Sequence, residues 1–225
     1  MLLDMDGVLC KHPIRAKYIQ TKIEHYVRHK IDKHMPLKKA EKINTMLYKN
    51  FGHTLIGLQK LYDSNITLND FCNYVYDDAT IRDNMHYTEN SQTHHRLIQH
   101  CQQNNIPVYI LSNAPENWCR MVFQHPYVQT IGCDHSIYTF YPTSEICLKP
   151  NYITYIRLAQ YINHQDTRKK NKFLYVDDTF QNLTPMLHDK AWQLIWMNND
   201  PSTKQSIYTP QLTTIHDLDE LFAYT

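Results

Sequence analysis

Apolar residues follow two different periods along this chain. Between residues 14 and 93 they recur every three or four positions, which is the period of amphipathic helices. Pro36 opens one such run and Gly52 ends it, because glycine readily takes the backbone conformation that closes a helix. Thr67 is placed to cap a later run. The pattern predicts a compact block of helices in this part of the chain.

From residue 94 onward, short apolar runs alternate with helical periods. The run at 106–111 is almost continuously apolar, which is typical of a parallel strand buried on both faces. Strands and helices in alternation favour a parallel sheet with right-handed crossovers. The pattern predicts strands at 106–111, near 130–138, at 172–176 and at 192–197, and helices at 93–103, 115–124, 149–161 and 180–188.

The first residues predict one more strand, which ends in two acids. Leu2 and Leu3 precede Asp4, and Asp6 follows two positions later. Residues i and i+2 of a strand point the same way, so Asp4 and Asp6 can converge on one ligand. Gly7 then lets the backbone turn away without the steric penalty of a Cβ atom. An ordinary turn after an edge strand is the alternative interpretation.

Polar pairs follow three of the predicted strands. In an open parallel sheet the carboxyl ends of the strands form the crevice where ligands bind, so the pairs are expected to meet there. The alternative is that each pair caps the helix after it, which explains one pair more readily than all three together. The pairs are Asp4 and Asp6, Ser112 and Asn113, and Asp177 and Asp178.

Lys149 completes a set of groups suited to phosphoryl transfer. The set contains carboxylates, one hydroxyl and one ammonium group. A phosphate that approached Asp4 without a cation would meet repulsion of about 4 kcal/mol for each pair of unit charges at contact distance. Lys149 and a divalent metal with oxygen ligands turn this repulsion into a net attraction for the phosphate. Mg²⁺ is therefore the expected cofactor.

Composition narrows the class of partner. The formal net charge of +1 over 225 residues provides no bulk attraction to nucleic acid or to an anionic membrane. No run approaches the roughly 20 apolar residues of a membrane span, so a cytoplasmic location is expected. The 6 cysteines form no CxxC pair, so neither a zinc site nor a disulfide framework is indicated.

Four segments together resemble a known family. Asp4-Met5-Asp6-Gly7-Val8, Ser112-Asn113, Lys149-Pro150 and Asp177-Asp178 resemble, in order and rough spacing, the four motifs of the haloacid dehalogenase (HAD) superfamily of phosphohydrolases. Residues 176–182 and 48–58 further resemble its pyrimidine 5′-nucleotidase branch. The resemblance implies an α/β fold, in which a Rossmann-like, three-layer α/β/α core from 1–13 and 94–225 carries an inserted α-helical bundle cap at 14–93.

The same resemblance implies a role for each motif residue. Asp4 would be the nucleophile that forms an aspartyl-phosphate, and Asp6 would protonate the leaving oxygen and then deprotonate the attacking water. An acid at Asp6 favours a phosphatase, because a dehalogenase has no alcohol leaving group to protonate. Ser112 and the backbone amide of Asn113 would hold the transferring group, and Lys149 would neutralise it. Mg²⁺ would be held by Asp4, the Asp6 carbonyl and Asp178, with Asp177 bound directly or just behind them.

Two features depart from the family pattern. Only three residues precede Asp4, so the first strand is short or depends on contacts with the cap. Asn182 stands where many relatives carry another acid. This amide either weakens metal binding or is compensated by Asp177.

A helical lid over the crevice would exclude water and large substrates, which favours a small phosphomonoester. Tyr48, Phe51 and His53 are candidates for contact with a nucleobase, although aromatic residues at helical spacing more often pack in a core. His12 is a candidate for contact with the phosphate or the nucleoside, with an exposed turn as the alternative.

The sequence therefore predicts a Mg²⁺-dependent phosphomonoesterase, with a nucleoside 5′-monophosphate as the favoured substrate. The alternatives within this class are a phosphatase or mutase of sugar phosphates or other small metabolites. A catalytically silent binding or scaffold protein with the same fold is a third possibility. A nucleic-acid 3′-end phosphatase is disfavoured, because the chain is near neutral and an open basic groove would be needed.

Overall fold

The structure is a computed structural model that describes residues 1–84, 92–124, 137–165, 172–200 and 209–225. Its centre is a six-stranded sheet in the order β3-β2-β1-β4-β5-β6, and every neighbouring pair of strands is parallel. The predicted α/β fold with a Rossmann-like parallel sheet is thereby confirmed. The strands are β1 (Leu2–Leu3), β2 (Val108–Leu111), β3 (Ile137–Phe140), β4 (Phe173–Asp177), β5 (Trp192–Met197) and β6 (Leu212–Ile215).

The short strand β1 lies in the middle of the sheet and is held from both sides. Leu2 is in register with Tyr109 of β2 and Tyr175 of β4. The pairing continues beyond the strand, because Tyr109 N–H donates to the Met1 carbonyl at 2.8 Å and Asp4 N–H donates to the Val176 carbonyl at 2.9 Å. Two residues therefore suffice for this strand, and its neighbours in the sheet stabilise it.

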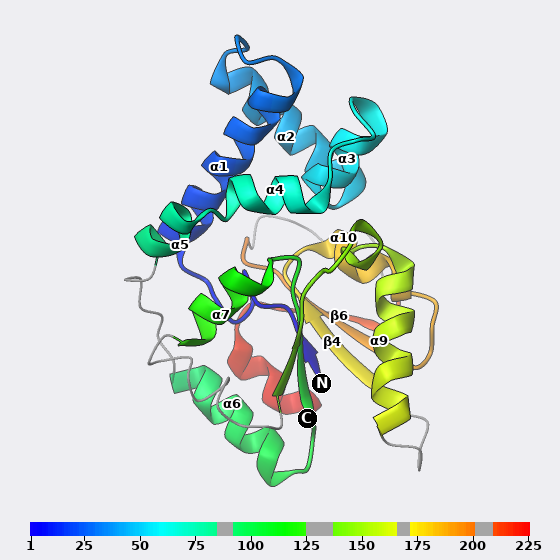
Figure 1. The fold of residues 1–225 in the computed structure, drawn as a ribbon. Helices are drawn as coiled ribbons and strands as arrows, with labels where there is room; N and C mark the ends of the chain where they lie inside the picture. Colours follow the sequence, from blue (N-terminus) through cyan, green and yellow to red (C-terminus); the bar gives the residue numbers. More distant parts are fainter. Residues whose placement is uncertain (85–91, 125–136, 166–171, 201–208) are drawn as a thin grey trace.

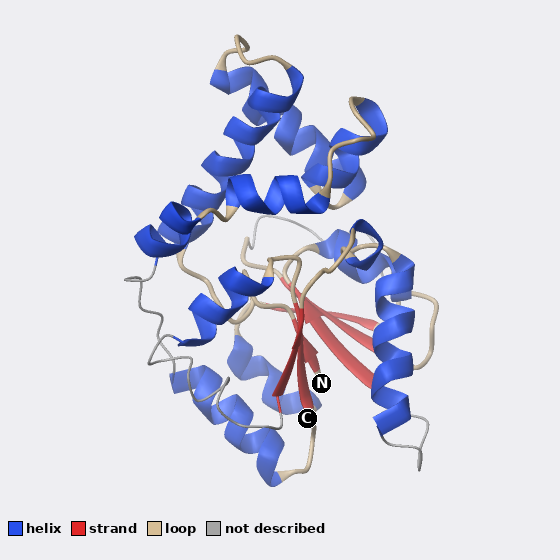
Figure 2. Cartoon of the chain, in the orientation of Figure 1, coloured by secondary structure: helices blue, strands red, loops and turns tan. Residues whose placement is uncertain are grey.

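Helices cover both faces of the sheet, which gives the predicted three layers (Figure 2). One apolar cluster joins one face to α6 (Gln92–Gln103), α7 (Glu116–Gln124) and the 3₁₀ helix η3 (Leu218–Tyr224). A second cluster joins the other face to α9 (Tyr152–Gln165), α10 (Phe180–Leu183) and the 3₁₀ helix η2 (Thr184–Met186). Both faces of the strands are buried, so their apolar runs are nearly continuous.

A separate group of helices stands over the carboxyl ends of the strands (Figure 1). These helices are α1 (Pro13–Ile31), α2 (Leu37–Phe51), α3 (Thr54–Leu61) and α4 (Leu68–Val75), followed by α5 (Asp78–Asn84). The first four pack around an apolar cluster of their own. Gly52 ends α2 with φ at 71°, and the Thr67 hydroxyl caps α4 by accepting from Asp70 N–H at 3.1 Å. The expected limit of this insertion, residue 93, follows 85–91, which lie outside the described residues.

Some elements differ from the predicted ones. The helix expected at 149–161 begins at Tyr152, and the helix expected at 180–188 gives way to η2 after Leu183, where Pro185 has no N–H to continue the α-helical pattern. The strand expected near 130–138 is β3 at 137–140, and 125–136 lie outside the described residues. The edge strand β6 was not predicted, because two of its four residues are half-buried threonines.

None of the described helices is both long and apolar enough to cross a membrane. The five cysteines that lie in the described part of the chain are free thiols.

Candidate active site

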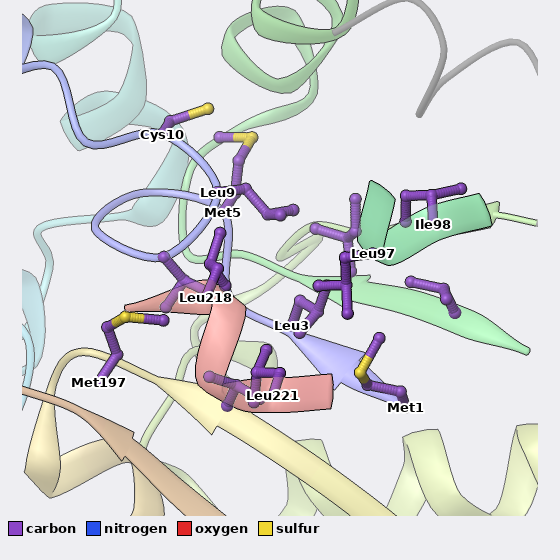
Figure 3. Packing of buried hydrophobic residues seen from close by; sticks show 14 of the residues in the cluster. Met1, Leu3, Met5, Leu9, Cys10, Leu97, Ile98, Met197, Leu218 and Leu221 are labelled. Atoms are coloured by element: carbon purple, nitrogen blue, oxygen red, sulfur yellow. The ribbon is translucent and has the colours of Figure 1, made fainter. Parts of the chain in front are cut away.

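A tight loop after β1 positions Asp4 and Asp6. The N–H groups of Leu9 and Cys10 both donate to the Met5 carbonyl, at 2.9 and 2.8 Å, and Gly7 N–H donates to the Cys10 carbonyl at 2.8 Å. Gly7 adopts a φ of 86°, which favours glycine. Met5 and Leu9 are buried in the same apolar cluster as Met197 and Leu218 (Figure 3). Packing of Met5 and Leu9 in the core therefore fixes the loop. Its two acids follow the carboxyl end of the central strand β1.

Lys149 joins two carboxylates that come from different strands. Its Nζ lies 2.7 Å from Asp4 Oδ1 and 2.8 Å from Asp177 Oδ2, and its side chain is 1% exposed. Burial lowers the pKa of Lys149, but the charges of Asp177 and Asp4 outweigh burial and raise the pKa above its ordinary value. The ammonium group is therefore charged at neutral pH.

Asn113 fixes the backbone of Lys149. Its Nδ2 donates to the Lys149 carbonyl at 3.0 Å, and Lys149 N–H donates to Asn113 Oδ1 at 2.8 Å. Ser112 is buried directly after β2, where its N–H donates to the Phe140 carbonyl and its Oγ accepts from Ala114 N–H, both at 3.0 Å. The loop after β2 therefore connects β3 to the segment that carries Lys149.

Asp177 is the most enclosed acid of the site, and several donors hold it. Asn182 Nδ2 lies 3.0 Å from Oδ1 and 3.1 Å from Oδ2, and Thr179 N–H donates to Oδ1 at 2.8 Å. The Tyr175 hydroxyl also donates to Oδ2. An amide at 182 thus orients Asp177 as a donor, which a second ionised acid at that position would not do.

Three carboxylates form a cluster that fits a divalent cation. Oxygen atoms of Asp4, Asp177 and Asp178 all lie within 4.8 Å of one another. Burial and the charge of Asp177 raise the pKa of Asp178 to about 7, and the same two causes raise the pKa of Asp4 although Lys149 opposes them. One lysine does not compensate three acids, and a hard cation with oxygen ligands does. These residues are thus suited to hold Mg²⁺.

The backbone of Gly7 packs directly against the Asp178 carboxylate of this cluster. A Cβ atom at this position would lie 2.0 Å from Asp178 Oδ2. The loop after β1 and the acid after β4 therefore share a space that only glycine leaves open.

Asp6 lines a cavity of about 500 Å³, and Asp178 of the carboxylate cluster lines the same cavity. Its Oδ1 accepts from the indole N–H of Trp118 at 3.3 Å. Burial raises the pKa of Asp6, while the hydrogen bond from Trp118 and the charge of Arg15 oppose this rise. The carboxyl group is therefore more easily protonated than an exposed aspartic acid, as a general acid requires.

The remaining candidate residues fall into two groups, those that line the cavity beside Asp6 and those that do not. His12 and Gly7 line the cavity beside Asp6, whereas the described residues that line it do not include Tyr48, Phe51 or His53. The Tyr48 hydroxyl lies 2.7 Å from Thr179 Oγ1, so this residue connects α2 to the core. Phe51 packs against the apolar cluster of the helical group.

His53 caps α3 from a buried position. Its Nδ1 accepts from Leu55 N–H at 3.2 Å. Burial and the charge of Lys149 together lower the pKa of His53 to about 4, so the ring is neutral at pH 7.

Sequence patterns alone missed four residues of the site. Tyr175 lies two positions before Asp177 on the same strand, so its side chain points the same way, and this spacing was the only local signal. Asp6 meets Trp118 of α7, and Arg15 of α1 lies over the Trp118 ring, 5.8 Å from its centre. Tyr76, which follows α4, completes this wall of the cavity. Only the packing of separate helices brings these three together.

The fold is shared with known proteins. No family model matches the sequence, and no curated protein does. Similar solved structures include a dehalogenase, with 11% identity over 100% of this chain and 95% of that chain and a TM-score of 0.55. An L-2-haloacid dehalogenase has 12% identity over 99% and 96% of the two chains, with a TM-score of 0.50.

A third similar structure is the putative HAD-hydrolase YfnB from Bacillus subtilis, with 14% identity over 99% of this chain and 96% of that chain and a TM-score of 0.52. That structure is described as bound to magnesium and as revealing interdomain movement. At these identities the likeness concerns the fold. The chain thus has the α/β fold of HAD-superfamily proteins, which agrees with the resemblance seen in its motifs.

Proposed function

We propose that this protein is a Mg²⁺-dependent phosphomonoesterase that acts through an aspartyl-phosphate on Asp4. The observation that carries the proposal is the pair formed by Asp4 and Asp6. Asp4 lies in the carboxylate cluster with Lys149, whereas Asp6 faces the cavity and has a raised pKa. These two environments support Asp4 as the nucleophile and Asp6 as the proton donor.

The proposed reaction has two steps. Lys149 Nζ and Met5 N–H both contact Oδ1 of Asp4, so we assign the attack on phosphorus to Oδ2. The bond between phosphorus and the leaving oxygen breaks, and Asp6 gives its proton to that oxygen. Water then attacks the phosphorus of the acyl phosphate, Asp6 takes the proton of the water, and the carboxylate of Asp4 is restored with release of phosphate. A Mg²⁺ ion held by Asp4, Asp177 and Asp178 would offset the charge of the phosphoryl oxygens.

The Asp6 carboxyl group favours phosphate esters over haloacids. A halide leaves as an anion without a proton, whereas an alkoxide leaving group needs a general acid. The dehalogenase names of two similar structures therefore do not decide the reaction of this chain.

A nucleoside 5′-monophosphate is the first substrate to test, and phosphates of sugars and other small metabolites are the second. The motif resemblance supports the nucleotide. Two aromatic rings line the cavity of about 500 Å³, although they belong to Tyr76 and Trp118 and not to the residues expected from the sequence.

A panel of phosphomonoesters tests this function through phosphate release with and without Mg²⁺. We expect turnover that a chelator stops and that Asp4→Asn abolishes. Asp63→Asn, which changes an aspartate in the turn after α3, is the matched control and should retain activity. Turnover of sugar phosphates without turnover of nucleotides would reject the nucleotidase assignment. A panel without any turnover would reject the enzyme and favour a binding or scaffold protein.

A further inference from the structure

The cavity beside Asp6 extends beyond the groups that the phosphoryl chemistry needs. Asp6, Gly7 and Asp178 of the candidate active site belong to its lining. If Asp6 protonates the leaving oxygen as proposed, the leaving group would extend into the rest of this cavity. The lining of that remaining part therefore bears on the substrate.

One wall of the cavity carries positively charged groups. Lys11, just before α1, and Arg15, in its first turn, supply these charges, whereas burial and the charge of Arg15 lower the pKa of the neighbouring His12 and keep its ring neutral at pH 7. Arg15 is only 4% exposed, and its guanidinium carbon lies 5.8 Å from the centre of the Trp118 ring. Stacking on an aromatic face orients a guanidinium group, whose planar set of donors matches a carboxylate or a phosphate.

The adjoining wall is aromatic and apolar. The ring centroids of Tyr76 and Trp118 lie 5.3 Å apart with an interplanar angle of 60°, and Ile19 lies beside them in the lining. Ring faces of this kind bind flat organic groups, and the few polar groups of such a cavity decide their orientation.

We propose that this cavity selects phosphomonoesters whose leaving group is a flat organic body with a second anionic group, a carboxylate or a phosphate, and that Arg15 recognises this group. The inference rests on the phosphomonoesterase activity proposed above. Arg15 contributes a positive charge to the lining, whereas an ionised Asp178 disfavours a second anion beside it. The substrate is therefore oriented with its phosphoryl group at Asp4 and its second anion at Arg15.

Two matched substrates test the charge alone. 4-Carboxyphenyl phosphate and 4-carbamoylphenyl phosphate have nearly the same size and differ by one negative charge. We expect the wild-type protein to prefer the carboxylate in kcat/KM by about 10- to 100-fold, which is the factor that one charge-assisted hydrogen-bonded contact supplies. 1,4-Phenylene bisphosphate, as a third substrate, shows whether a phosphate serves better than a carboxylate.

The variants assign the preference to one side chain. Arg15→Gln should bring the ratio of the two kcat/KM values close to one, and Lys11→Gln, in the exposed loop before α1, should lower it in part. Lys17→Gln is the control, because it removes a positive charge from an exposed position of the same helix that does not belong to the lining of this cavity. Lys17→Gln should retain the wild-type ratio.

Three results overturn the inference. One is equal turnover of both substrates by the wild-type protein, and another is an unchanged ratio in a folded Arg15→Gln variant. If Arg15→Gln does not fold, the third such result is an unchanged ratio of the two kcat/KM values in Lys11→Gln. If phosphate release still requires Asp4 in any of these cases, only the substrate inference is rejected and the proposed function is retained. If no phosphomonoester releases phosphate, the proposed function and the substrate inference are both rejected.

Discussion

At the scale of single residues, the charge balance around Lys149 determines what the site can bind. Asp4, Asp177 and Asp178 supply up to three negative charges against one buried ammonium group. Like charges at such distances repel by about 4 kcal/mol per pair at an intermediate effective dielectric. These acids are therefore suited to a further cation, and Gly7 leaves the space that the Asp178 carboxylate occupies.

Gly7→Ala tests this space. We expect the variant to lose the stabilisation that Mg²⁺ gives to the folded protein, because the new Cβ atom would displace the Asp178 carboxylate, which lies 2.0 Å from its position. Strain from the positive φ should also lower the free energy of unfolding by about 1–3 kcal/mol. Denaturant unfolding with and without Mg²⁺ measures both effects.

Gly52→Ala is the matched control for this variant. Gly52 has a similar φ of 71°, and a Cβ atom there would meet Pro150 at 2.6 Å and not a carboxylate. This variant should lose stability and keep its response to Mg²⁺. A full Mg²⁺ response in Gly7→Ala would show that Asp178 does not hold the ion.

Residues at strand ends could be predicted from the sequence, and residues brought in by helix packing could not. Asp4, Ser112 and Asp177 each follow an apolar run, so the topology of a parallel sheet alone places them on one edge. Trp118 and Arg15 lie on helices far apart in the sequence, and no local pattern indicates that they meet at Asp6. Asn113 was expected to contact the substrate through its amide, and its side chain additionally fixes Lys149.

At the scale of elements, the end of α2 is a contact between the helical group and the core. The Tyr48 hydroxyl lies 2.7 Å from Thr179 Oγ1, next to two acids of the site. Gly52 approaches Pro150, which follows Lys149. The helices above the sheet therefore touch the segments that carry the acids and the lysine.

Tyr48→Phe tests this contact. We expect faster hydrogen exchange at the end of α2 and a loss of about 2- to 10-fold in kcat/KM, which is the scale of one exposed hydrogen bond. The free energy of unfolding should change by less than about 1 kcal/mol, because Tyr48 is partly exposed. Tyr62→Phe, at an exposed tyrosine after α3, is the control. If both variants behave alike, the contact does not hold the helices on the core.

Caps and apolar periods allowed most elements to be predicted, whereas weakly patterned ones were missed. Gly52 and Thr67 end and begin helices as expected, because their conformational preferences are local. β6 carries two half-buried threonines at the edge of the sheet, so its sequence hardly differs from that of a loop. The end of α10 was misplaced because Pro185 changes the hydrogen-bond pattern within a segment whose apolar residues keep a helical spacing.

At the scale of the whole molecule, the proposed Mg²⁺ site would link metal binding to pH through Asp178. Without a cation its pKa is raised to about 7, so the folded protein binds this proton more tightly than the unfolded chain does. Asp178 therefore lowers the stability of the metal-free protein as pH rises from about 4 to beyond 7. Mg²⁺ favours the ionised carboxylate, so its stabilising effect should grow over the same interval.

Thermal unfolding at pH 5 and pH 8 measures this linkage. We expect saturating Mg²⁺ to raise Tm by about 3–6 °C at pH 8 and by clearly less at pH 5. Asp178→Asn should lose both the shift and its dependence on pH. Equal shifts at the two pH values, or a shift that persists in Asp178→Asn, would contradict the assignment of this carboxylate to the metal.

The most direct test of the whole account is to trap the phosphorylated enzyme. Asp6→Asn lacks the base that activates water, and 4-nitrophenyl phosphate has a leaving group that needs little protonation, so the acyl phosphate should accumulate. Mass spectrometry after an acid quench should find one added phosphoryl group on the peptide that contains Asp4, and none when Asp4→Asn is added to this variant. A phosphoryl group on another residue, or phosphate release without any phosphorylated enzyme, would contradict the account.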